Sequence, residues 1–229
     1  MSLFKKEFLN EVGICLDQRE TEGNLDKAIT LLMDLKAKYP NEDIICGKLS
    51  SAYFYKALFE TNPKRQELFY EHGVNYGREA ATLNPRAIYG NYWYASNVGM
   101  LGICRGIMAS LASIDPMKKS YEIVLKENEG FFFGGPHRAL GRLYHMAPGW
   151  PISIGSKSKA LFHLERAVEL GPEFFNNRLF LAELYVDIGQ KDKAKAELQW
   201  IASNEVKAEH RIEDSVYKEK GMEILKKYF

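Results

Sequence analysis

The strongest constraint on the fold is a helical pattern in residues 175–203. A motif L-A-x-x-Y begins at Leu181, and a motif A-x-x-x-L begins at Ala194. In both segments apolar residues recur three and four positions apart, which is typical of amphipathic helices. The small residues Ala182 and Ala194 stand 12 positions apart. Because small side chains let two helix axes approach closely, the pattern predicts a helix pair that crosses at these two alanines.

The preceding stretch, residues 134–172, has the same pattern with a longer loop. The motif L-G-x-x-Y begins at Leu140 and A-x-x-x-L begins at Ala160, but Gly141 and Ala160 stand 19 positions apart. Compared with the spacing of 12 above, seven residues are inserted in the loop that contains APGWPIS. Helix pairs of this kind resemble the tetratricopeptide repeat (TPR), a helix–turn–helix unit of about 34 residues.

The repeat spacing divides the whole chain into helix pairs. Each pair exposes an apolar face until the next pair covers it, and the last one needs a cap with a polar outer face. We therefore expect an all-α, TPR-like helical-hairpin solenoid, a right-handed superhelix of about four degenerate repeats with extra central helices, and a single domain over residues 1–229. The repeat-like units are expected at residues 3–40, 43–85, 87–128, 134–172 and 175–203, with the cap at 204–229.

The central stretch, residues 87–114, carries a single charge, Arg105. A membrane-spanning helix must be considered for so apolar a run. Polar asparagines and several glycines argue against one, so we expect buried helices at about 89–100 and 101–113. A further helix should begin after Asp115-Pro116, because proline is well tolerated in a first turn and aspartate can cap it.

Small residues recur at helical steps within this stretch, at Gly99, Gly102, Gly106 and Ser113. The simpler interpretation is a face on which another helix packs closely. The alternative is that the missing side chains leave room for a ligand.

The totals exclude some classes of protein. The net charge of +1 gives no sign of nucleic acid, a membrane surface or an acidic partner as the main target. The three cysteines, Cys15, Cys46 and Cys104, are odd in number and far apart, which predicts buried free thiols rather than disulfides. No H-E-x-x-H, G-x-S-x-G or phosphate-loop motif occurs. We therefore expect no enzyme activity, no metal and no cofactor.

Arg138, Arg142 and His145 follow one face of the helix that contains L-G-x-x-Y. We expect this face to border the inner surface of the solenoid. Two guanidinium groups on one face can bind a carboxylate or a phosphate through paired hydrogen bonds. The alternative is pairing with acidic residues of neighbouring helices, such as Glu165 or Glu183.

Four other side chains complete the set of candidate binding residues. Tyr92 and Ser96 should lie on the inner surface of the central helices. Arg105 needs a partner if it is buried, either a protein carboxylate or a ligand. Trp150 stands between two prolines and either packs over the helix ends or forms the lid or wall of a pocket.

A second resemblance runs from Asn91 to Ala194. It rests on the runs Tyr92-Trp93-Tyr94-Ala95-x-Asn97, Gly102-x-x-x-Gly106-Ile107, Gly134-Gly135-x-x-Arg138-x-Leu140-Gly141-Arg142-Leu143-Tyr144 and Ala147-Pro148-Gly149. These runs resemble the T-component family of tripartite ATP-independent periplasmic (TRAP) transporters. The resemblance implies an all-helical repeat protein with a hydrophobic groove or pore, which assists a periplasmic solute-binding protein.

These observations predict a non-catalytic, TPR-like binding scaffold. Its partner is a protein, which under the resemblance is a periplasmic solute-binding protein, or a small hydrophobic or anionic ligand; a homo-oligomer is compatible with the sequence. The alternative is a cytoplasmic TPR adaptor that binds peptides. The chain opens with MSLFKKEF, which lacks the apolar run of a signal peptide. This favours the cytoplasm, whereas the periplasm or cell envelope follows from the resemblance if a leader has been removed.

Overall fold

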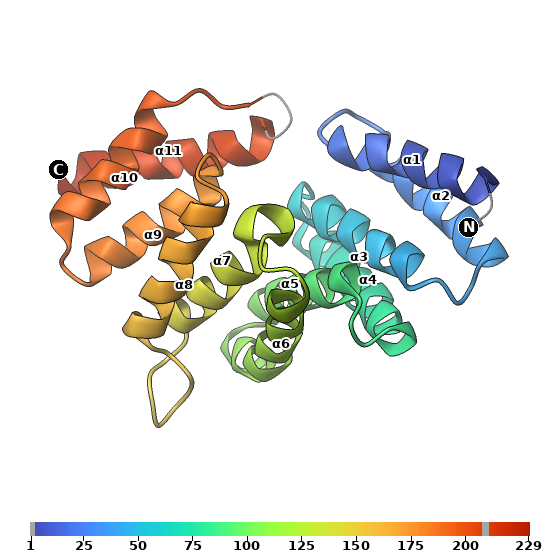
Figure 1. Ribbon diagram of the computed structural model, residues 1–229, viewed down its shortest axis with the longest axis horizontal. Helices are drawn as coiled ribbons and strands as arrows, with labels where there is room; N and C mark the ends of the chain where they lie inside the picture. Colours follow the sequence, from blue (N-terminus) through green and yellow to red (C-terminus); the bar gives the residue numbers. More distant parts are fainter. Residues whose placement is uncertain (1–2, 208–210) are drawn as a thin grey trace. The chain divides into compact units, whose positions relative to one another are not determined.

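The computed structural model describes residues 3–207 and 211–229, with only the backbone described for residues 3–7 and 212. In these parts of the chain it consists of eleven α-helices without a β-strand, as the repeat spacing predicts (Figure 1). The helices form two compact units, residues 1–127 and 128–229. The expectation of one domain over the whole chain is not tested by this division and stays a prediction.

Unit 1 contains three consecutive helix pairs. Within it each helix packs against the next, and α3 also packs against α5. The pairs lie within the ranges expected for the first three repeat-like units, residues 3–40, 43–85 and 87–128, and the division of the chain at these boundaries stays a prediction. The helices are α1 (Leu3–Asp17), α2 (Asn24–Lys38), α3 (Asp43–Leu58), α4 (Pro63–Leu83), α5 (Ile88–Arg105) and α6 (Ile107–Glu127).

Unit 2 contains two helix pairs and a final helix. The last helix packs on both members of the second pair, which is the position expected of a cap, although residues 208–210 of the expected cap lie outside the described residues. The helices are α7 (Phe131–Met146), α8 (Lys157–Leu170), α9 (Phe175–Asp187), α10 (Lys191–Ser203) and α11 (Arg211–Tyr228).

Local sequence explains several helix ends. The Asn62 side chain accepts hydrogen bonds from the backbone N–H groups of Lys64 and Arg65 at the start of α4, and Pro63 occupies the first turn. Ser156 caps α8 in the same way. Gly106, with φ of 94°, ends α5 in a backbone conformation that favours glycine.

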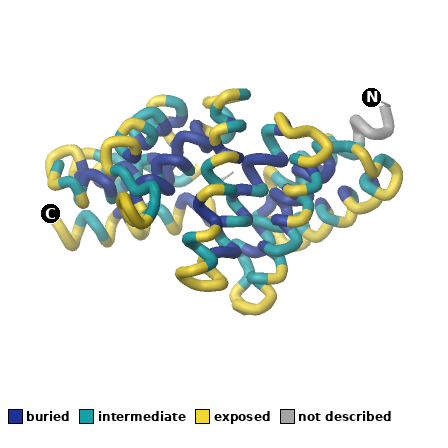
Figure 2. The backbone as a smooth tube through the Cα atoms, turned by 90° about the horizontal axis from the view of Figure 1, so that it is seen from below, coloured by how far each residue is buried: buried dark blue, intermediate teal, exposed yellow. Residues whose placement is uncertain are grey.

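The core of each unit lies between its helix pairs, and buried positions alternate with exposed ones along the helices (Figure 2). In unit 1, one cluster joins α1, α2 and α3, and a second joins α3, α4 and α5. In unit 2, a cluster that includes Phe175, Leu198 and Ile201 joins α9 to α10, and Tyr217 and Leu225 of α11 pack against it.

Small residues stand where the paired helices cross, as the motifs predict. A Cβ atom built on Gly141 would lie 2.6 Å from Cγ of Leu164 in α8. Ala160, Ala182 and Ala194 are fully buried. The glycines of α5 also serve close packing: the Cβ position of Gly102 is 3.1 Å from Cα of Ser110 in α6. Atoms of α6 therefore occupy the room that a ligand would have needed there.

The central stretch corrects three expectations. The break expected near residue 101 does not exist, because α5 continues to Arg105. The helix start expected at Asp115-Pro116 is also wrong, because α6 runs through Pro116 without ending. Ser113 and Ile114 before the proline and Ser120, Tyr121 and Val124 after it are buried. This burial holds the helix together despite the missing N–H group of the proline.

The third correction concerns Cys104, which is exposed at the end of α5, whereas Cys15 and Cys46 are buried; all three are free thiols. None of the helices in the described parts of the chain is long and apolar enough to cross a membrane, α5 and α6 included.

The tight crossing of α4 and α5 is open to a stability test. A Cβ atom on Gly77 would lie 2.7 Å from Cα of Tyr94, whereas one on Gly13 in α1 would meet no atom within 4 Å. We expect Gly77→Ala to lower the free energy of unfolding by about 1–3 kcal/mol through overpacking. Gly13→Ala should raise it by up to about 1 kcal/mol through helix propensity. Urea denaturation of both variants measures the free energy of unfolding. An equal change in the two variants would contradict the close approach of α4 and α5 at Gly77.

Candidate functional site

The predicted binding residues of α7 face α9, the first helix of the next repeat. Arg138 is 5% exposed, and its Nη1 donates to Oδ1 of Asn177 at 2.9 Å and to the carbonyl of Phe132 at 3.3 Å. Its guanidinium also lies 4.7 Å from the centre of the Phe174 ring. Arg138 therefore connects α7 to α9 from a buried position.

The next two residues of this face bind carboxylates of α9. Arg142 forms an ion pair with Glu183, and its guanidinium lies 4.4 Å from the centre of the Phe180 ring. Nε2 of His145 lies 2.7 Å from Oδ2 of Asp187. Glu183 is one of the partners that the alternative interpretation named. All three side chains thus join adjacent repeats, and a ligand-binding role for them stays a prediction.

Burial controls the charge of His145. Its side chain is 3% exposed, and its Nδ1 atom is buried without a hydrogen-bond partner. A protonated imidazole donates from both nitrogens, so protonation would strand a buried donor. Burial therefore lowers the pKa of His145 although Asp187 acts in the opposite direction. The pKa of Asp187 is lowered, first by its hydrogen bond to His145 and also by Lys157.

A left-handed turn precedes the regular part of α7. Phe132, Phe133 and Gly134 have φ values of 49°, 56° and 73°. Each non-glycine residue in this conformation costs about 1–2 kcal/mol. The run G-F-F-F-G-G is therefore a connector held in a strained backbone conformation by contacts elsewhere in unit 2.

Asn177 provides the most direct of those contacts. Its Nδ2 donates to the carbonyls of Phe133 at 2.9 Å, Ala167 at 2.8 Å and Gly171 at 3.0 Å. Its Oδ1 accepts from Arg138. The side chain is fully buried. One amide thus ties the left-handed turn to the end of α8 and to Arg138.

The seven-residue insertion forms part of a loop between α7 and α8. Trp150 in this loop is 89% exposed, so it does not pack over the helix ends. Its role as the wall or lid of a pocket stays a prediction. A hollow of about 570 Å³ opens beside α11, but it is lined by residues such as Lys218, Met222 and Glu223 and by none of the predicted binding residues.

The remaining candidates lie in unit 1 and contact other helices of that unit. Tyr92 is 5% exposed and packs edge-on against Tyr121 of α6. Oγ of Ser96 lies 3.0 Å from the hydroxyl oxygen of Tyr121. Arg105 is exposed rather than buried, and it pairs with Glu67 at 2.7 Å and Glu71 at 3.2 Å on α4. Protein carboxylates thus satisfy Arg105, whereas Tyr92 and Ser96 face α6.

A surface that sequence reasoning did not identify lies on α3 and α4. We call it the aromatic face and define it as Tyr53, Phe69, His72 and Tyr76. The ring of Tyr53 is stacked on that of Tyr76 at 5.6 Å between centres, and it also lies 5.0 Å from His72 and 6.3 Å from Phe69. All four residues are half-buried, so part of each remains accessible to solvent.

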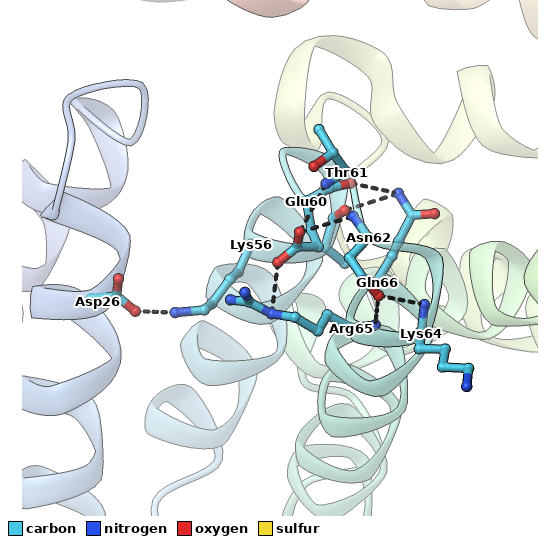
Figure 3. A network of polar contacts seen from close by, with 9 residues as sticks. Asp26, Lys56, Glu60, Thr61, Asn62, Lys64, Arg65 and Gln66 are labelled. Atoms are coloured by element: carbon cyan, nitrogen blue, oxygen red, sulfur yellow. Dashed lines mark hydrogen bonds and ion pairs between the residues drawn. The ribbon is translucent and has the colours of Figure 1, made fainter.

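Charged pairs border the aromatic face. At one end Lys56 lies over the Phe69 ring. Lys56 also pairs with Asp26 of α2, and Arg65 pairs with Glu60 (Figure 3). The carboxylate of Glu60 also accepts from the backbone N–H of Asn62, which is the main cause of its lowered pKa.

On the α2 side, Lys36 pairs with Glu79, and the hydroxyl of Tyr76 donates to Sδ of Met33 at 3.2 Å. Residues of α2 therefore border the aromatic face, whose four rings lie on α3 and α4.

The sequence contained one signal for this surface. Phe69, His72 and Tyr76 are spaced i, i+3 and i+7, which places them on a single face of α4. Such a stripe ordinarily predicts core packing, so spacing alone does not show that the rings remain partly accessible.

Comparisons with known proteins agree with this architecture. A family model described as "RMD1-3: Regulator of microtubule dynamics protein 1-3" matches residues 12–132, more than half of the chain. Respiratory supercomplex factor 1, mitochondrial, of Arthroderma otae is 33% identical over 70 residues, which are 31% of this chain and 35% of that protein. The chain thus spans about a third of that relative's length.

Two solved structures are similar along nearly their whole length. TTC0263, a TPR protein of Thermus thermophilus, has a TM-score of 0.67 at 17% identity, with 94% of this chain and 98% of that chain covered. MamA has a TM-score of 0.52 at 15% identity, with 93% and 97% covered. These likenesses show the TPR-like fold and nothing more specific.

The Asn177 amide is expected to be essential for unit 2. Asn177→Ala removes the donor to three carbonyls and leaves the buried Arg138 without one acceptor, so it should lower the free energy of unfolding by about 3 kcal/mol. Asn176→Ala is the matched control, because Oδ1 of Asn176 is buried without a partner. Thermal and urea denaturation compare the two, and a similar loss in both variants would contradict this role.

The lowered pKa of His145 predicts acid sensitivity. The unfolded chain binds the proton more readily than the folded one, so stability should fall as the pH drops from about 7.5 through the ordinary histidine range to about 5. His137, whose pKa burial also lowers, contributes in the same direction. Asp187 stays ionised in this window because its pKa is lowered. His145→Gln should flatten the curve of unfolding free energy against pH; an unchanged slope would exclude His145 as a cause.

Proposed function

The chain belongs to the regulator of microtubule dynamics protein 1-3 family, and from this membership we propose that it is a non-catalytic scaffold that binds tubulin in microtubules. The chain is a TPR-like scaffold, a fold suited to protein interaction. The observation that carries the proposal is the aromatic face of unit 1. All four of its residues lie inside the segment that the family model matches.

The aromatic face suits an extended protein segment with ring-shaped side chains. Neighbouring rings with accessible edges can stack with proline or aromatic residues, and each aromatic pair contributes about 0.5–1.5 kcal/mol beyond the area that it buries. Helix packing already fixes the four rings, so little side-chain freedom is lost on binding.

The bordering lysines favour a segment that is also acidic. Lys56 pairs with Asp26, whose side chain is 70% exposed, and Lys36 pairs with Glu79, which is 40% exposed. The acids are the more exposed members of these two surface pairs, so a partner's carboxylate can reach and replace either acid. The proposed ligand is therefore an acidic segment of tubulin with ring-bearing residues.

A second candidate function follows from the T-component resemblance. In that role the chain would assist a periplasmic solute-binding protein. The run that ends at Asn97 and the run that contains Arg138 support it. Both residues have internal contacts, since Asn97 donates to Ser50 and Trp93, and Arg138 to Asn177. Packing thus accounts for them without a transporter, and binding of a small hydrophobic or anionic ligand also stays a prediction.

The alternative of a TPR adaptor that binds peptides is compatible with the fold and with the aromatic face. It differs from the leading proposal only in the identity of the partner. The two are distinguished by whether microtubules themselves are bound.

Co-sedimentation of the purified chain with microtubules tests the proposal. We expect the chain to pellet with microtubules, and the variant His72→Ala with Tyr76→Ala to bind at least about fivefold more weakly, because two stacking contacts are lost. Leu68→Ala is the matched control: Leu68 lies on the same helix, is 47% exposed and is outside the aromatic face.

Three outcomes would contradict the proposal. The first is that the wild type remains in the supernatant, and the second is that the double variant binds as tightly as the wild type. The third is that the control loses as much affinity as the double variant. Selective binding to a periplasmic solute-binding protein in a parallel assay would favour the second candidate. Thermal melts of each variant are needed to check that the substitutions leave the fold intact.

A further inference from the structure

The loop between α7 and α8, residues 147–156, has an ordered base. The backbone N–H of Gly155 donates to the carbonyl of Pro148, and that of Ser156 donates to the carbonyl of Tyr144, both at 2.9 Å. A Cβ atom on Gly155 would lie 2.1 Å from the carbonyl oxygen of Ala147. The two ends of the loop are therefore packed closely together.

The tip of this loop is ordered and apolar. The N–H groups of Ile152 and Ser153 both donate to the carbonyl of Gly149, at 3.0 and 3.2 Å. Trp150 is 89% exposed and Ile152 is 75% exposed. The loop projects away from the two helices that it joins (Figure 1). A convex tip thus presents two large apolar side chains to solvent.

The charged residues that stand close to the loop in the sequence are all basic. Residues 146–164 contain Lys157 and Lys159 and no acidic residue. Both lysines are exposed and stand just after the loop. The nearest acid shown to contact them is Asp187 of α9, which lies 3.3 Å from Nζ of Lys157 and also binds His145. Lys159 lies over the ring of Tyr144 at 5.3 Å.

We propose that this loop is a shallow anchor for the surface of an anionic phospholipid bilayer. Trp150 and Ile152 enter the interfacial region, where tryptophan and tyrosine are enriched. Lys157 and Lys159 remain at the level of the headgroups and attract negative charge. The loop segment itself carries no charge that would have to be buried.

The shape and chemistry of the loop favour a bilayer over a protein pocket as the occupant. A protein partner would need a cavity that matches a projecting tryptophan and isoleucine, whereas an interface of lipid headgroups and acyl chains accepts them without matched shape. The loop's own hydrogen bonds fix its conformation beforehand, which lowers the entropic cost of insertion. This anchor is independent of the aromatic face, which lies in unit 1.

Vesicle sedimentation of the full chain tests the proposal. We expect binding to phosphatidylcholine vesicles that contain about one third phosphatidylserine, and weaker binding to pure phosphatidylcholine vesicles. The variant Trp150→Ser with Ile152→Ser should lose at least about tenfold in partition coefficient, since insertion depends on buried apolar area. The variant Ile107→Ser with Met108→Ser is the matched control, because these first two residues of α6 are 80% and 79% exposed.

Tryptophan fluorescence gives a second readout. Trp93 is 4% exposed and Trp200 packs against Phe175, so a blue shift and quenching by brominated lipids should come from Trp150. Microtubule co-sedimentation of the loop variant should be unchanged, which separates failure of this proposal from failure of the proposed function.

Four results would overturn the anchor. The first two are that the wild type fails to bind anionic vesicles, or that it binds neutral vesicles equally well. The other two are that the loop variant binds as tightly as the wild type, or that the control loses as much vesicle affinity as the loop variant. Sedimentation velocity tests whether a second copy of the chain binds the loop instead. If the wild type is a dimer that the loop substitutions dissociate, and it does not bind vesicles, the loop serves self-association.

Discussion

The architecture depends on close approach of paired helices at positions without a large side chain. At Gly141 and Gly77 the neighbouring helix occupies the space in which a Cβ atom would stand. Once the axes are this close, the longer apolar side chains on either side interdigitate and exclude water. The repeat therefore depends on the absence of a side chain at a few glycines as much as on the buried apolar side chains around them.

Buried amides connect neighbouring segments through hydrogen bonds to backbone carbonyls. In unit 1, Asn97 donates to the carbonyls of Ser50 and Trp93, and the hydroxyl of Ser50 donates to the carbonyl of Gly73. In unit 2, Asn177 binds three carbonyls and compensates for a left-handed turn. Buried polar networks of this kind make the packing around them rigid and specific.

The same logic changes the meaning of the arginine and histidine face on α7. A row of cations on one helix face is compatible with an anion site, but in this chain its members already bind Asn177, Glu183 and Asp187 of the next repeat. The two surfaces proposed here for binding are of a different kind. One is the partly accessible aromatic face of unit 1, and the other is the apolar tip of the loop in unit 2.

The sequence by itself determined the all-α class, the pairing of helices and the place of the insertion, because twelve-residue spacing and small residues are local features of the chain. It did not determine that α6 continues through Pro116, that Arg105 is exposed or that Arg138 is satisfied by Asn177. Those outcomes depend on which side chains of distant segments meet, and only the tertiary structure decides that. Trp150 shows the difference most clearly. The sequence predicts that it lies in an inserted loop, but its exposure depends on the packing of the two ends of the loop at Gly155.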